Sequence, residues 1–281
     1  EVFEKTQSNE IRKPELWEPG YNLVAKPMEN RVDEASFGKI ARITGQSEAF
    51  VRSVVQSNEA LPVLRIDSEQ SALRISELLL EAGFETFVVS DIELDLKNSP
   101  QRLRKIEFAD DFVTFTLFNG DSTVEIPCAD LVLIIAGSIF ERTTERTEKY
   151  VKSKENKTIS LDQADRHEKI FDIYAKNERL GYRVFTHGFD FSGLKSEMSF
   201  LAFENLEKIK TKLVKLGVNA LFDQTYDNNR GILGSVWEVE ETVDSRGLTK
   251  KGVADFNLTK TASVTNLSQF TRYSRLKRAF L

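Results

Sequence analysis

The central part of the chain alternates apolar and polar residues with the period of β-strands. Residues 105–109, 112–118 and 123–126 have this pattern, and Asn119-Gly120 favours a tight hairpin turn because both residues tolerate positive φ. A more continuous apolar run covers residues 131–140. It follows Pro127, which ends the third strand because proline donates no ladder hydrogen bond. The pattern predicts four strands in succession.

The segment before these strands has the spacing of short helices. Helices are predicted over residues 36–45 and 48–57, and a third begins at Ser68 and ends at Gly83. Strands are predicted over residues 61–66 and 85–89. Residues 34–92 therefore form a small α/β module, and the charged connector 91–101 with Pro100 marks a domain boundary.

The second module is expected over residues 103–217. Further strands are predicted over residues 170–175 and 182–191, and residues 197–216 form an amphipathic helix with a stripe from Ala202 to Leu216. Residues 141–169 carry mixed charges and are too long for an ordinary strand connection. We interpret them as an inserted, solvated loop; the alternative is an arm that orders on a partner.

The two ends of the chain are expected to dock, either on partners or on the rest of this chain. Residues 1–33 form an extended N-terminal arm with Trp17 and Tyr21 as aromatic anchors. Residues 218–281 form a C-terminal extension that ends in a basic aromatic tail. This tail would dock on another protein or on the acidic remainder of this chain, lie on an acidic membrane surface or bind RNA. Protein docking is favoured because the chain is acidic overall. Its proposed anchors are Phe270, Arg272, Tyr273, Arg275, Lys277, Arg278 and Phe280.

Composition narrows the class of protein. A length of 281 residues favours two domains, and 40% hydrophobic with 30% charged residues is typical of a globular chain. The net charge of −5 argues against a general nucleic-acid binder. No signal peptide or transmembrane helix is visible, so a cytoplasmic protein is expected. The single cysteine, Cys128, excludes an intramolecular disulfide and is interpreted as a buried thiol.

Candidate chemistry is sparse. His187 and Asp190 lie three residues apart in a predicted strand, which places them on opposite sides, and His167 lies in a charged stretch with no metal-binding spacing. The chain has no glycine-rich phosphate loop and no nucleophile elbow. We therefore predict a protein that is not an enzyme, with no cofactor and no metal.

Two modules resemble known families. Ile43-Thr44-Gly45, the segment 68–72 and Leu80 to Phe84 resemble the C-terminal domain of the bacterial ribosomal stalk protein over about residues 36–89. That family binds translational GTPases through a basic helical face, and the resemblance implies its fold and a protein-docking use of the helices. Arg52 falls near one basic position, whereas Asp33 and Ala41 occupy others. The strands and closing helix of residues 103–217 resemble bacterial pleckstrin-homology-like barrels.

The sequence thus predicts an α+β protein, with a small α/β sandwich followed by a pleckstrin-homology-like β-barrel with a closing helix. The predicted function is that of a non-catalytic scaffold or accessory subunit, part of a larger complex, that docks on protein partners through its arm and tail. One alternative is a nucleic-acid- or ribosome-associated factor that uses the tail. Another is small-ligand sensing in the barrel.

Overall fold

The computed structural model describes residues 12–27, 32–120, 122–151, 156–250 and 255–281. It contains two sheets with helices packed on them, which confirms the α+β class. The chain divides into two compact units. Unit 1 consists of Glu1–Asn98, Asn228–Glu238 and Arg275–Leu281, and unit 2 consists of Ser99–Asp227 and Val239–Ser274. Each unit is therefore assembled from separate stretches of the sequence.

Unit 1 contains a three-stranded antiparallel sheet with the order β2-β1-β3. Its strands are β1 (Tyr21–Ala25), β2 (Pro62–Ile66) and β3 (Thr86–Ser90), and its helices are α1 (Glu34–Thr44), α2 (Glu48–Ser57) and α3 (Glu69–Glu81). The predicted caps are present, because Ser47 and Ser68 each accept a backbone hydrogen bond and Gly45 ends α1 with a φ of 67°. The helices and strands predicted within residues 34–92 are confirmed.

The extended-arm prediction for residues 1–33 is wrong at residues 21–25, which form the central strand of unit 1. Leu23 and Val24 are fully buried there. Asn22 is also fully buried, and its side-chain oxygen accepts a hydrogen bond from Trp237 Nε1 at 2.8 Å, within the same unit. The apolar run of this strand is too short to stand out in the sequence. Residues 1–11 and 28–31 of the predicted arm lie outside the described residues.

Unit 2 is built on a nine-stranded sheet with the order β11-β12-β7-β8-β9-β4-β5-β6, in which β10 also pairs with β7. The predicted strands in the middle of the chain are present, although the one predicted over residues 182–191 ends at Phe185. The sheet is open between β6 and β11, so a closed pleckstrin-homology-like barrel is not confirmed. The strands are β4 (Gln101–Phe108), β5 (Phe112–Leu117), β6 (Thr123–Pro127), β7 (Leu131–Val151), β8 (Asn156–Ala175), β9 (Tyr182–Phe185), β10 (Leu221–Asp223), β11 (Glu240–Lys250) and β12 (Asp255–Thr265).

Helices pack on both faces of this sheet within unit 2. The helix α4 (Ala202–Leu216) places Leu206, Ile209 and Leu213 in a buried cluster with sheet residues such as Ile134 and Phe171. The opposite face of the sheet packs on α6 (Leu267–Ala279), since a Cβ added at Gly137 would lie 2.6 Å from the Phe270 ring. The remaining helices are η1 (Cys128–Asp130), η2 (Phe191–Glu197) and α5 (Tyr226–Leu233).

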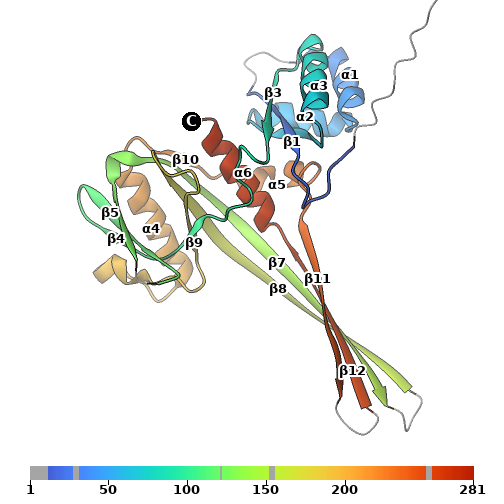
Figure 1. Ribbon diagram of the computed structural model, residues 1–281. Coiled ribbons are helices and arrows are strands. Elements are labelled where there is room, and N and C mark those ends of the chain that lie inside the picture. Colours follow the sequence, from blue (N-terminus) through green and yellow to red (C-terminus); the bar gives the residue numbers. More distant parts are fainter. Residues whose placement is uncertain (1–11, 28–31, 121, 152–155, 251–254) are drawn as a thin grey trace, which may run out of the picture. The chain divides into compact units, whose positions relative to one another are not determined.

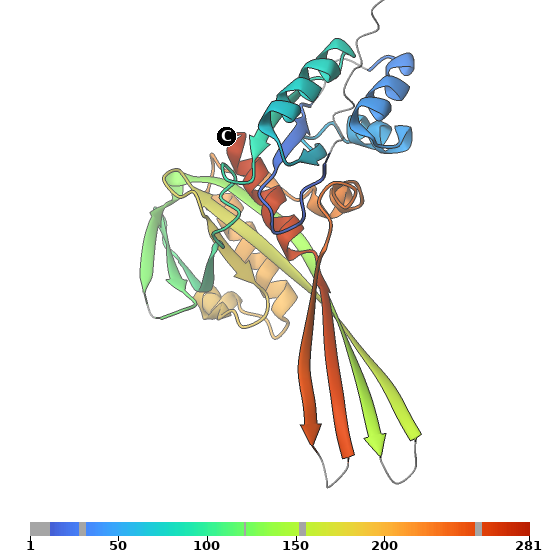
Figure 2. The same cartoon turned by 45° about the vertical axis from the view of Figure 1, so that its right-hand side comes forward.

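The predicted inserted loop 141–169 is instead part of a long β-hairpin. The strands β7 and β8 stay paired from Glu141 opposite Arg166 to Val151 opposite Asn156. The hairpin β11–β12 joins it through β12, which pairs with β7 over residues 141–151. Figures 1 and 2 show the two hairpins running side by side beyond the helices of unit 2. We call residues 141–151, 156–166, 240–250 and 255–265 the blade.

Candidate docking surface

The blade has one face that is rich in acids and hydroxyls. Residues directly opposite one another in antiparallel strands share a face, so the register of the four strands assigns each side chain to a side. Among the described side chains, the face that contains Thr143 carries five acids and one base, Arg166. We call it the acidic face, and its charged members are Glu141, Glu145, Asp162, Arg166, Glu240 and Asp244.

One row across the acidic face places acids next to each other without a base. Glu145 lies directly opposite Asp162 on β8, and on the other side opposite Thr261, which in turn faces Asp244. No described basic side chain pairs with these three acids. Like charges directly opposite each other destabilise a sheet. The arrangement therefore weakens folding, and it favours the binding of positive charge.

The rest of the acidic face is small and hydroxylated. Thr143 and Ser263 place their hydroxyl oxygens 3.3 Å apart across β7 and β12, and Thr147 and Thr259 do so at 3.4 Å. These β-branched and hydroxyl side chains stabilise paired strands without an apolar core. The result is a flat surface from which the acids project.

The opposite face of the blade is balanced in charge. Arg142 donates to Asp165 at 2.9 Å, and Arg146 forms an ion pair with Glu148 at 2.9 Å. The arginine holds the pKa of Asp165 below its usual value through a hydrogen bond. The two faces thus differ in net charge although they share the same strands.

A cavity of about 230 Å³ lies at the base of the acidic face, where β7 and β8 enter the body of unit 2. Arg166 forms an ion pair with Glu168 at 3.1 Å beside it, and Glu168 also accepts a hydrogen bond from the backbone N–H of His187. Arg102 donates to the His187 carbonyl oxygen at 2.9 Å and stacks on the Phe118 ring at 3.7 Å. The lining residues are Arg102, Ile139, Glu141, Arg166, Glu168, Phe185, His187, Thr265 and Leu267.

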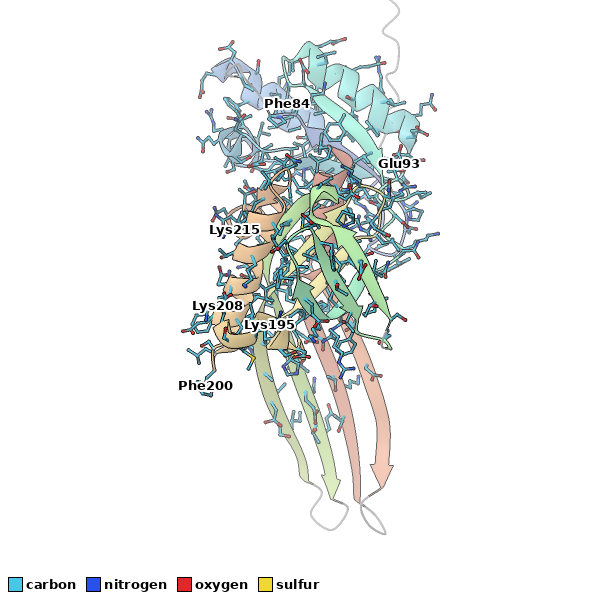
Figure 3. The ribbon with its side chains drawn as sticks, turned by 90° about the vertical axis from the view of Figure 1, so that its left-hand side faces the viewer. Phe84, Glu93, Lys195, Phe200, Lys208 and Lys215 are labelled. Carbon is cyan, nitrogen blue, oxygen red and sulfur yellow. The ribbon has the colours of Figure 1, made fainter. Side chains whose placement is uncertain are left out.

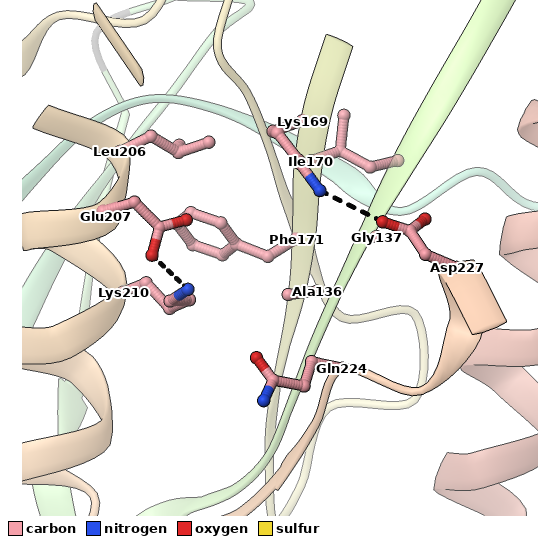
Figure 4. Close-up of a pocket in the computed structure, with 10 residues that line it drawn as sticks. All are labelled: Ala136, Gly137, Lys169, Ile170, Phe171, Leu206, Glu207, Lys210, Gln224 and Asp227. Carbon is pink, nitrogen blue, oxygen red and sulfur yellow. Dashed lines mark hydrogen bonds and ion pairs between the residues drawn. The ribbon is translucent and has the colours of Figure 1, made fainter. Parts of the chain in front are cut away.

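A second, smaller cavity of about 100 Å³ lies between α4 and the sheet (Figure 4). Asp227 accepts hydrogen bonds from the Ser138 hydroxyl at 2.6 Å and its backbone N–H at 2.7 Å, and it pairs with Lys169 at 3.0 Å. Burial alone would raise the pKa of Asp227, but the bonds from Ser138 and Lys169 outweigh it and lower the pKa. These bonds saturate the carboxylate, which indicates a structural role in joining α5 to β7.

The structure buries most of the predicted tail. Phe270 and Tyr273 are fully buried, and Arg272 and Arg275 are 8% and 4% exposed. They lie on α6, so they belong to the fold instead of a free docking tail, which corrects that expectation. Helical spacing of aromatic residues is the common signature of a core helix. The buried Arg275 donates to the carbonyl oxygen of Asn98, far away in the sequence, at 3.2 Å. Within unit 2, Tyr273 donates to Asp223 at 2.9 Å.

The end of α6 belongs to unit 1. Lys277 forms an ion pair with Glu59, and Phe280 meets the Phe87 ring edge-on with the centroids 4.4 Å apart. Arg278 is half-buried.

Of the two predicted anchors in the N-terminal arm, Trp17 is 81% exposed beside a cavity of about 240 Å³, and Tyr21 is half-buried in β1. Trp17 thus remains a surface residue, and its partner-binding role stays a prediction.

The interpretation of Cys128 as a buried thiol is confirmed. Burial, with a smaller contribution from Asp111, raises the pKa of this thiol. His167 and His187 are exposed. Within residues 12–27, 32–120, 122–151, 156–250 and 255–281, no group of three or more His, Cys, Asp or Glu side chains is placed to hold a metal ion.

Comparisons with family models, with curated proteins and with solved structures find no match to this chain. The stalk-domain and pleckstrin-homology-like resemblances therefore stay predictions. No helix in the described part of the chain is long and apolar enough to cross a membrane.

The blade was not predicted from the sequence. The signal that could have indicated it is the alternation of threonine with charged residues over residues 141–148.

Proposed function

We propose that the chain is a non-catalytic accessory subunit whose blade docks on a basic protein partner. The observation that carries the proposal is the row formed by Asp244, Glu145 and Asp162, in which acids stand together on a sheet face that no described element of unit 2 covers. A basic surface on the partner would relieve their repulsion and give the contact its affinity and orientation.

The blade also suits docking by its construction. The blade is continuous with the core of unit 2, because β7 starts at the buried Leu131 and ends at Val151. Its pairing with β8 is regular from Leu133 onward. A binding surface on a rigid element loses little conformational entropy when a partner binds. The protruding hairpins thus take the docking role that the sequence suggested for the arm and the tail.

The stalk-domain resemblance supports a docking function in a weaker way. The three helices and two strands on which the stalk-domain resemblance rests are present in the expected order in unit 1. The predicted use of that helical face in protein docking is part of this proposal. The strand run and closing helix that suggested a pleckstrin-homology-like domain are also present, although in an open sheet.

The test compares two double variants of the full chain. Glu145→Lys with Asp162→Lys reverses the central pair of the acidic face, and Thr144→Lys with Gln163→Lys adds the same two lysines at the adjacent pair on the opposite face. Each tagged protein is incubated with lysate of the source cells at two salt concentrations, and the bound proteins are identified. Circular dichroism verifies that both variants fold.

The proposal predicts a basic partner that wild type and the opposite-face variant both retain. The acidic-face variant should bind this partner with an affinity lower by about tenfold or more, because close charge pairs contribute strongly to binding. Binding should also weaken as salt screens the charges. Equal retention by the two variants, or equal loss, would show that the acidic face is not the docking surface.

A further inference from the structure

A short loop of unit 2 exposes four large apolar side chains in six residues. Residues 198–203 follow η2, extend into the first turn of α4 and read Met-Ser-Phe-Leu-Ala-Phe. Phe200 is fully exposed, and Met198, Leu201 and Phe203 are 54%, 51% and 59% exposed. Figure 3 shows Phe200 at the end of α4, pointing away from the body of the unit. Clusters of exposed apolar side chains usually mark an interaction site.

Buried groups fix the backbone of this loop. Asn205, which is 3% exposed, accepts a hydrogen bond from the Ser199 backbone N–H at 2.6 Å and donates one to the Ser199 carbonyl oxygen at 2.7 Å. The Ser199 hydroxyl donates to Glu204. Upstream, a Cβ added at Gly193 would lie 1.9 Å from the Ile106 carbonyl oxygen, so η2 is held closely against β4. The loop is therefore anchored at both ends while its apolar side chains face outward.

Lysines outnumber glutamates in the segment that includes and follows the apolar loop, although Lys210 forms an ion pair with Glu207. Residues 195–216 contain five lysines and three glutamates in a chain whose net charge is −5. Glu197 is neutralised by Lys212, whose Nζ lies 2.6 Å from its carboxylate, and Lys208 donates to the Glu197 carbonyl oxygen at 2.7 Å. Figure 3 shows Lys195 and Lys208 near Phe200, with Lys215 further along α4.

We infer that this loop is a membrane-surface anchor that inserts Phe200, Leu201 and Phe203 into the interface of an anionic lipid bilayer. Apolar side chains enter the boundary between headgroups and acyl chains, and lysines beside them attract anionic headgroups. A protruding apolar tip with Lys195 and Lys208 nearby combines both signals, and stable attachment needs two of them. This inference is independent of the blade and its protein partner.

The test is co-sedimentation of the full chain with lipid vesicles. One set contains phosphatidylcholine alone, and the other also contains phosphatidylserine. Binding to the anionic vesicles is expected, with little binding to phosphatidylcholine. The variant Phe200→Ser with Phe203→Ser should lower the partition constant by about tenfold or more, since each buried apolar group adds to partition. Lys208→Glu with Lys215→Glu should remove the preference for phosphatidylserine.

The matched control is Leu161→Ser with Val243→Ser, which removes two exposed apolar side chains, each 68% exposed, from the blade. It should bind vesicles as wild type does. All of these side chains are at least partly exposed, and circular dichroism verifies folding. Absence of binding to anionic vesicles would overturn the inference. So would self-association that Phe200→Ser with Phe203→Ser abolishes while vesicle binding persists, because the loop would then be a protein contact.

Discussion

Arg183 and Asp172 form a bidentate ion pair in the interior of unit 2, with Nε–Oδ1 and Nη2–Oδ2 distances of 2.7 and 2.8 Å. Their side chains are 4% and 0% exposed. Burial alone would lower the pKa of Arg183, but Asp172 opposes it and the pKa is raised. Ser274 of α6 donates to the same carboxylate at 2.6 Å, so the pair joins β8, β9 and α6.

Asp172→Ala should therefore destabilise the protein strongly. It leaves the Arg183 guanidinium buried without its counter-ion, which costs about 3–5 kcal/mol in the free energy of unfolding. Urea denaturation followed by circular dichroism measures the loss. The matched control is Asp165→Ala, which breaks the exposed pair with Arg142 and should leave the midpoint unchanged. Equal effects of the two substitutions would contradict the assignment of a buried, structural pair.

The contact between Gly137 and Phe270 gives a second prediction. Phe270→Ala removes a fully buried ring and should cost about 3–5 kcal/mol. Gly137→Ala adds a methyl group 2.6 Å from that ring and should cost about 1–3 kcal/mol by overpacking. Thermal unfolding tests both. If Phe270→Ala unfolded at the wild-type temperature, the side chain would be a surface residue, as the sequence first suggested.

Acidification should weaken the bond between α5 and β7. The pKa of Asp227 is lowered in the folded protein. Its carboxylate therefore stabilises the fold at pH values above its ordinary pKa of 3.8, and this stabilisation is lost as the pH falls through the lowered folded pKa. Asp227→Asn removes this titration. The variant should be less stable than wild type at neutral pH, and this difference in stability should shrink as the pH falls. Urea midpoints measured over this range compare the two proteins, and a constant deficit would contradict the prediction.

Local patterns in the sequence were sufficient to predict most helices and strands. The helices around Ile40, Val51 and Ile75 have apolar stripes and capping residues, and the strands around Phe115 and Ile134 have clear apolar faces. In each case the signal lies within about fifteen residues, which is the range over which periodicity is informative.

The elements that sequence reasoning misplaced depend on distant residues. Among the described side chains of the blade, no apolar face is buried, so its strands lack the apolar–polar alternation that usually marks a strand. Part of their order comes from pairing between β7 and β12, which are more than a hundred residues apart in the sequence. The arginines of α6 suggested a surface, yet Arg272 and Arg275 are buried. Residues 197–216 were predicted as one amphipathic helix, but α4 begins at Ala202. The exposed Phe200 lies in the loop before it and was missed, because exposure at a loop has no periodic signature.

Unit 1 contains three stretches of the sequence, and this constrains the order in which the protein is built. Asn22 of the central strand needs Trp237, and Phe87 needs Phe280. A ribosome produces residues 21–90 first, and domains generally begin to fold as they emerge. Here the side-chain nitrogen of Asn22 finds Val89 and Asp91 within the same stretch, but its side-chain oxygen lacks the Trp237 donor until residue 237 has been synthesised. Unit 1 can therefore reach its final form only after translation of unit 2, so the unit whose synthesis starts earlier is the later of the two to be completed.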